Sequence, residues 1–67
     1  MLTKREQQVM ELVIKGLTNE EISKELEITT HTIKAHLISV YTKLKVKNRV
    51  QAAVKFLLNK KDFQYKK

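Results

Sequence analysis

Hydrophobic residues recur at helical spacing in four segments of this 67-residue chain, and polar residues separate the segments. In the first segment a broad apolar stripe follows Thr3 and Glu6, which are three residues apart as in a capping box. Gly16 stands where a glycine in the left-handed conformation ends a helix. The pattern therefore predicts a helix over about residues 4–15.

The second segment begins with the same signal. Thr18 precedes Glu21 by three residues, and Ile22 and Leu26 are four apart, so that both face one side of a helix. Ser23 lies between them as a small residue that lets two helices approach closely. We expect a short helix over about residues 19–26.

A third helix is predicted from about residue 30 to residue 44, after a tight turn and the capping residue Thr29. Its expected buried seam has the spacing of one helix face and consists of Ile33, Leu37, Val40 and Leu44. The opposite face carries no acidic residue and consists of His31, Lys34, Ala35, Ile38 and Thr42. A face that only solubilised the helix would be richer in Glu and Lys, so this composition indicates a binding surface.

A fourth helix is expected after Asn48, which caps it with Gln51 at the third position. Two apolar stripes follow. The larger is expected to pack on the other helices and consists of Val50, Val54, Leu57 and Leu58. The smaller stripe, Ala52 and Phe56, is not needed by a single core and is predicted to form a dimer contact. The tail 60–67 is polar and expected to fray, so the predicted domain covers residues 1–59.

Composition excludes several classes of protein. The chain has no Cys, which excludes a disulfide framework and any Cys-based metal or redox site. His31 and His36 are too few to hold zinc on their own, so no metal and no cofactor are expected. The apolar runs are far shorter than a membrane span and no signal peptide is visible, so we expect a cytoplasmic protein without a membrane partner.

Charge is distributed unevenly along the chain. Residues 1–28 hold four basic and six acidic residues, a net charge of −2, whereas residues 29–67 hold ten basic residues and one acidic residue, a net charge of +9. Such asymmetry favours a polyanionic partner for the second half. A solvated, Lys-rich surface is the alternative interpretation of the charge alone.

The second and third helices, with a turn of about three residues between them, form a predicted helix-turn-helix unit within an all-α, four-helix bundle. Such a unit presents short side chains of its second helix in the major groove of duplex DNA. Lys34 can donate to guanine O6 and N7, and Ala35 and Ile38 can contact thymine methyl groups. Thr30 and His31 can reach a base edge or a phosphate near the start of the helix.

The chain from Leu2 to Val54 resembles the LuxR/GerE-type helix-turn-helix domain of bacterial regulators. The matching segments are Leu2-Thr3-Lys4-Arg5-Glu6, Gly16-Leu17-Thr18-Asn19-Glu20-Glu21-Ile22, Thr29, Thr32-Ile33-Lys34, His36, Lys43-Leu44-Lys45-Val46 and Asn48-Arg49-Val50-Gln51-Ala52. The resemblance implies that the third helix reads DNA and that the fourth makes a dimer contact. One departure is Lys45, which replaces the glycine usual after Lys-Leu, so that the third helix is expected to end differently.

The resemblance also implies roles for individual residues. It puts Lys34, Ala35 and Ile38 at the base-reading positions, and Ile38 is a variable position in the family. His31, near the start of the same helix, is a further candidate for base reading. DNA-backbone contacts fall on Thr18, Thr30, Thr32, Lys43 and Lys47. The expected partners are double-stranded DNA, a second copy of the chain at least on DNA, and RNA polymerase as a further candidate. Glu6 completes a helix cap, with an ion pair to Arg49 as the alternative.

Three other functions are open to such a chain, and an enzyme is not among them, because no phosphate loop or catalytic constellation is present. Region four of a sigma factor shares the opening motif and the helix-turn-helix, but the segment Asn48–Ala52 argues against it. A helical protein-interaction module would use Ala52 and Phe56 as its patch. A basic membrane-surface peptide is disfavoured because three helices precede the candidate segment. The sequence is compatible with a free-standing regulator and with the effector half of a longer one.

Overall fold

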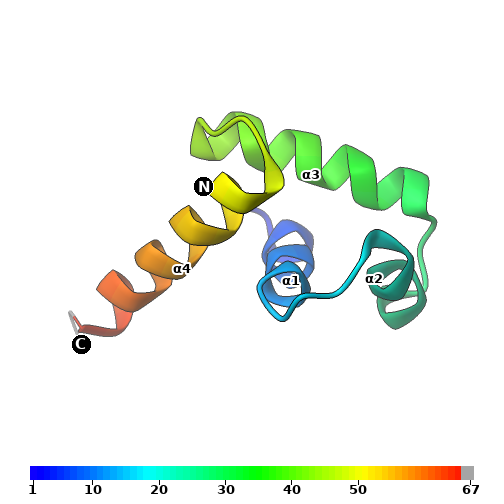
Figure 1. Ribbon diagram of the computed structural model, residues 1–67, viewed down its shortest axis with the longest axis horizontal. Coiled ribbons are helices and arrows are strands. Elements are labelled where there is room, and N and C mark those ends of the chain that lie inside the picture. The colour runs from blue at the N-terminus through cyan, green and yellow to red at the C-terminus, as the bar shows by residue number, and fades with distance from the viewer. Residues whose placement is uncertain (66–67) are drawn as a thin grey trace.

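The structure is a computed structural model that describes the backbone of residues 1–65 and the side chains of residues 1–59. It contains four helices, α1 (Lys4–Val13), α2 (Asn19–Leu26), α3 (Thr30–Leu44) and α4 (Arg49–Tyr65), and no strand among the described residues. The predicted all-α fold is therefore confirmed. α1 and α2 lie on the same side of the long helix α3, and the C-terminal part of α4 projects beyond the other helices (Figure 1).

The helix starts follow the predicted capping signals. The Thr3 side chain accepts a hydrogen bond from the backbone N–H of Glu6, and the Glu6 carboxylate accepts one from the backbone N–H of Thr3. Thr18 and Glu21 make the same reciprocal pair at the start of α2. Each pair satisfies two N–H groups that the first turn of a helix leaves without an intrahelical partner.

α3 and α4 begin with single caps. Thr29 Oγ1 accepts a hydrogen bond from the backbone N–H of Thr32, as the sequence predicts. At α4 the Asn48 side chain accepts from the backbone N–H of Gln51, at 2.9 Å. The Gln51 side chain in turn accepts from the backbone N–H of Lys47, one residue before the cap. The predicted start of α4 at Asn48 is confirmed.

The helix ends use left-handed residues, only one of which is glycine. Gly16 follows α1 with φ +89°, as predicted, although α1 itself ends at Val13, earlier than expected. Glu27 ends α2 with φ 59°, and Lys45 ends α3 with φ 60°. A residue with a side chain is strained in this conformation by about 1–2 kcal/mol. Lys45 therefore adopts the conformation that the glycine usual at this position would adopt without strain, so the expectation that α3 ends differently is wrong.

The core lies where α1, α2 and α4 meet one side of α3. The predicted seam of α3 is confirmed at three positions, since Ile33, Leu37 and Val40 are buried, while Leu44 is half-buried against the same cluster. Among the residues whose side chains the structure describes, the buried apolar ones are Val9, Met10, Val13, Ile22, Ile33, Leu37, Val40, Ala52 and Phe56. These residues come from all four helices, so the chain folds around a single core.

The predicted faces of α4 are interchanged in the structure. Ala52 and Phe56, expected on a free dimer surface, are 0% and 9% exposed and belong to the core. The stripe expected to pack is exposed by 46–72% and consists of Val50, Val54, Leu57 and Leu58. The prediction that Ala52 and Phe56 form a dimer interface is therefore wrong. The protein-interaction module that would have used the same two residues loses its patch as well.

α4 continues as a helix through Tyr65, beyond the predicted domain boundary at residue 59. Residues 66 and 67, the end of the predicted tail, lie outside the described residues. The domain boundary stays a prediction. Within the described part of the chain, none of the four helices is long and apolar enough to cross a membrane.

Candidate nucleic-acid interface

The turn between α2 and α3 is fixed by hydrogen bonds that close it on both sides. The backbone N–H of Ile28 donates to the Ser23 carbonyl at 3.1 Å, and Ser23 Oγ donates back to the Ile28 carbonyl. Ser23 is thus the small residue where α2 meets the turn, and its hydroxyl also fixes the turn's geometry. The left-handed Glu27 between them ends α2. α2, this turn and α3 form a helix-turn-helix unit.

The outer face of α3 carries the predicted base-reading residues. His31, Lys34 and Ala35 are exposed, and the Ile38 side chain is 65% exposed. Their exposure makes these side chains available to a ligand, and Lys34 in addition lines a depression that residues of α2 and α4 border. α3 contains no acidic residue, so nothing on the helix itself repels a phosphate backbone.

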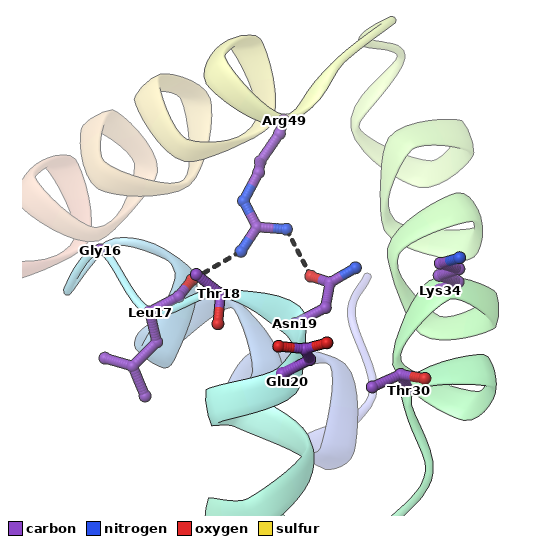
Figure 2. Close-up of a pocket in the computed structure, with 8 residues that line it drawn as sticks. All are labelled: Gly16, Leu17, Thr18, Asn19, Glu20, Thr30, Lys34 and Arg49. Carbon is purple, nitrogen blue, oxygen red and sulfur yellow. Dashed lines mark hydrogen bonds between the residues drawn. The ribbon is translucent and has the colours of Figure 1, made fainter.

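Two of the predicted phosphate-contacting residues gather beside this face. Thr18 and Thr30 line one open depression of about 580 Å³, together with the predicted base-reading residue Lys34 and with Arg49 and Glu20 (Figure 2). The depression lies where the first turns of α2, α3 and α4 converge. Backbone N–H groups at helix starts attract anions, so this is a suitable place for a phosphate group. Thr32 lies in the first turn of α3 and is half-buried, and Lys47 is exposed beyond the end of α3.

Arg49 holds the start of α4 against the turn between α1 and α2. Its guanidinium donates to Asn19 Oδ1 at 2.6 Å and to the Leu17 carbonyl at 2.7 Å (Figure 2). The ion pair between Arg49 and Glu6, offered as an alternative from the sequence, is therefore not formed. The position of Arg49 at the beginning of α4 is visible in the sequence, but its partners depend on how three helices meet.

Glu6 is the buried carboxylate that ties α1 to α3. It is 4% exposed and accepts hydrogen bonds from Ser39 Oγ at 2.6 Å and from Lys43 Nζ at 2.9 Å, besides the backbone N–H of Thr3. Burial alone would raise the pKa of Glu6, but the hydrogen bonds from Lys43, Ser39 and Thr3 and the charge of Lys43 outweigh it and lower this pKa from 4.5 to about 2. The carboxylate is ionised at neutral pH.

The Glu6 pair changes the expectation for Lys43. The sequence assigned this residue to a DNA-backbone contact, and its side chain is 33% exposed. Its ammonium is bound to Glu6, so removing the lysine would leave a buried carboxylate without its counter-charge. The main role of Lys43 is therefore structural, as the counter-charge of Glu6. Sequence reasoning missed this pair because 37 residues separate its members.

The family profile described as "Bacterial regulatory proteins, luxR family" matches residues 1–56. The chain belongs to this family. Its fold and its family identify it as a helix-turn-helix DNA-binding domain of transcription regulators, and not as an enzyme. Among its described residues there is also no group of three side chains able to hold a metal ion.

Relatives of this luxR-family domain include regulators of several bacteria. It is 49% identical over 53 residues to the transcriptional regulatory protein LiaR of Bacillus subtilis, covering 79% of this chain and 25% of LiaR. It is 41% identical over 54 residues to the response regulator VraR of Staphylococcus aureus, covering 81% of this chain and 26% of VraR. The chain therefore spans about a quarter of the length of these curated relatives.

Solved structures show the same fold. The DNA-binding domain of the response regulator ComA, solved in complex with the anti-activator RapF, is 36% identical with a TM-score of 0.81 over 84% of this chain and 97% of that one. The response regulator ChrA of a heme-sensing two-component system is 32% identical with a TM-score of 0.86, over 90% of this chain and 30% of ChrA. The four-helix arrangement of this chain is thus the luxR-family arrangement.

Proposed function

We propose that this domain binds duplex DNA sequence-specifically, with α3 in the major groove, as the effector part of a bacterial transcription regulator. The single observation that supports this most strongly is the exposed, acid-free outer face of α3, where Lys34 lies beside the apolar Ala35 and Ile38. A lysine that can donate to guanine next to small and apolar side chains is suited to base edges. The +9 charge of residues 29–67 supports attraction to the phosphate backbone.

The residues divide into two kinds of contact. Lys34, Ala35, Ile38 and His31 face the bases in this proposal. Thr18, Thr30 and Thr32 contact phosphates at the helix starts, and Lys47 does so beyond the end of α3. Lys43 shares its ammonium between Glu6 and a phosphate, because an ammonium group has three donors and Glu6 uses one of them.

The proposal includes a homodimer formed through the exposed side of α4. The four apolar residues of this side are spaced as one helix stripe, and an apolar stripe along a projecting helix is suited to pairing with its own copy across a two-fold axis. The stripe consists of Val50, Val54, Leu57 and Leu58. The contact is small, so we expect pairing to be weak in solution and completed on adjacent half-sites.

The cellular setting is also a proposal. Since the matched region makes up about a quarter of these relatives, we propose that the domain works in the cytoplasm as the output domain of a response-regulator-type protein. Its partners there would be DNA, a second copy and RNA polymerase.

Binding-site selection from random duplexes, followed by competition with scrambled DNA, tests the function. Lys34→Ala should weaken binding to the best site by roughly 10-fold to 100-fold and scrambled DNA far less. The matched control Lys47→Ala should weaken both about equally. Log affinity should also fall with log salt, with a slope near −4 if a monomer neutralises about four phosphates. A slope near zero, or no sequence preference, would refute the proposal.

The dimer is tested by Val54→Glu on a paired site and on a lone half-site. The substitution should abolish cooperativity on the paired site and change affinity for the lone half-site little, because Val54 is 51% exposed on α4 and is not one of the residues proposed to contact DNA. Asn59→Glu, an exposed position outside the stripe, controls for the added charge. Undiminished cooperativity in Val54→Glu would place the dimer contact elsewhere.

A further inference from the structure

Three side chains form an apolar strip along the outer face of α3, and Ile38 is its centre. Ile38 is 65% exposed, whereas the other isoleucine of this helix, Ile33, is fully buried. Thr42 lies one turn further on, and its hydroxyl donates to the Ile38 carbonyl at 3.1 Å. The helix backbone therefore takes the hydroxyl hydrogen, so that Thr42 cannot donate to a base acceptor, and its methyl group is the apolar group that it offers to a ligand. Ala35, one turn before Ile38, completes the strip with its methyl group.

The spacing of these residues matches that of stacked base pairs. A helix rises about 1.5 Å per residue, so Lys34 and Ile38 are about 6 Å apart along its axis and Ile38 and Thr42 are a further 6 Å apart. Bases along one DNA strand are about 3.4 Å apart. Ile38 therefore lies about two base steps from the base that Lys34 contacts, and Thr42 about two steps beyond Ile38.

The chemistry of the strip selects among base edges. In the major groove, adenine, guanine and cytosine present donors and acceptors, and only thymine presents a methyl group. An isoleucine opposite an amino or carbonyl group would remove it from water without a hydrogen bond, which is unfavourable. An isoleucine opposite a thymine methyl buries apolar surface on both sides. Ile38 has no polar atom that could replace the hydrogen bonds which the amino and carbonyl groups of the other bases would lose.

We propose that Ile38, extended by Thr42, reads the 5-methyl groups of thymines that begin about two base pairs from the base contacted by Lys34. This inference rests on the proposed function, and it names the class of half-site. In such a half-site, a base contacted by the Lys34 ammonium is followed along the DNA by thymines. Ile38 contacts the DNA directly and so determines specificity.

The test replaces single thymines of the selected site with deoxyuridine, which removes the methyl group and leaves the pairing edge unchanged. For the unmodified chain, replacing a thymine under Ile38 should weaken binding about fourfold, the value of one buried methyl group. For Ile38→Ala the same replacement should change the affinity less than twofold. Thr42→Ser keeps the hydroxyl and removes the methyl group, so it should abolish the response only for thymines nearest Thr42. A thymine outside the protected region provides the control replacement.

Each outcome bears on one proposal. If the chain prefers a site but deoxyuridine replacements under Ile38 are neutral, methyl reading is refuted and the proposed function stands. If Ile38→Ala loses affinity on replacement as much as the unmodified chain, the methyl group acts through the DNA and the role of Ile38 is refuted. If no duplex is preferred over scrambled DNA, the proposed function itself fails. Circular dichroism of both variants checks that exposed substitutions leave the fold intact.

Discussion

α3 and α4 are the two long helices of this domain, and each buries one side while exposing apolar residues on the other. In α3 the buried seam of Ile33, Leu37 and Val40 has the position that the sequence predicts. In α4 the sequence predicts the wrong side, since Ala52 and Phe56 are buried and the larger stripe is exposed.

The two helices differ in how their apolar residues are distributed. On α3 polar and small residues fill the side opposite the seam, with Ile38 as the one large apolar exception. On α4 apolar residues occupy both sides, so periodicity offers two candidate faces and cannot choose between them. Arg49, Ala52, Ala53 and Phe56 share one face by their spacing, and the hydrogen bonds of Arg49 turn that face inward. A polar contact at the start of the helix is therefore consistent with its observed rotation.

The largest expected effect separates the two sides of α4 directly. Phe56→Ala should lower the free energy of unfolding by about 3–5 kcal/mol, because a buried aromatic side chain leaves a cavity. Leu57→Ala, the adjacent and 46% exposed position, should lower it by less than about 1 kcal/mol. Urea unfolding followed by circular dichroism measures both. Equal losses would mean that α4 is rotated differently from the structure.

The second prediction concerns acid. Low pH should weaken the contact that anchors α3, between Glu6 and Lys43, and leave unchanged the hydrogen bonds of Arg49 that anchor α4. Folding lowers the pKa of Glu6 from 4.5 to about 2, so its contribution to stability is present above pH 4.5 and is lost as the pH falls towards 2. Arg49 bonds to an amide and a carbonyl, which do not titrate in this range. Unfolding free energies measured from pH 6 to pH 2 should decline in this window.

Glu6→Gln is the matched variant for the acid experiment. It should be less stable than the unmodified chain at pH 6, because the paired carboxylate is replaced, and the difference between the two should shrink as the pH falls. A constant difference down to pH 2 would show that Glu6 does not carry the decline.

A third, intermediate effect is expected at the anchor of α4. Arg49→Met removes two hydrogen bonds from a charged donor and should lower the free energy of unfolding by about 1.5–3 kcal/mol. Lys47→Met, at an exposed position two residues earlier, should change it by less than about 0.5 kcal/mol. Thermal unfolding of both variants provides the comparison. An unchanged Arg49→Met domain would show that α4 is oriented by its apolar residues alone.

The smallest expected effect is at the end of α3. Lys45→Gly relieves a left-handed strain of about 1–2 kcal/mol and adds freedom to the unfolded chain worth about 0.4–1 kcal/mol, so it should stabilise the domain by about 0.5–1 kcal/mol. Gly16→Ala is the reciprocal control. An added Cβ meets no atom within 4 Å there, so its cost comes from the backbone conformation alone, and it should destabilise the domain. A destabilised Lys45→Gly would contradict the left-handed assignment.

The sequence alone determined what depends on neighbours along the chain. Thr3 with Glu6, Thr18 with Glu21 and Asn48 with Gln51 specify helix starts within three residues, and Gly16 specifies a left-handed stop. The seam of α3 and its acid-free outer face follow from helical periodicity, so the helix-turn-helix and its candidate base-reading residues were predictable.

The tertiary structure decided what depends on residues far apart in the chain. Lys43 binds Glu6 across 37 positions, and Arg49 binds Asn19 across 30. Neither pair can be predicted from neighbouring residues. The sequence around a charged residue does not show whether its side chain contacts water, a phosphate or a buried partner. The inward face of α4 follows from such contacts too: with apolar residues on both sides, its rotation is settled by the surfaces it meets.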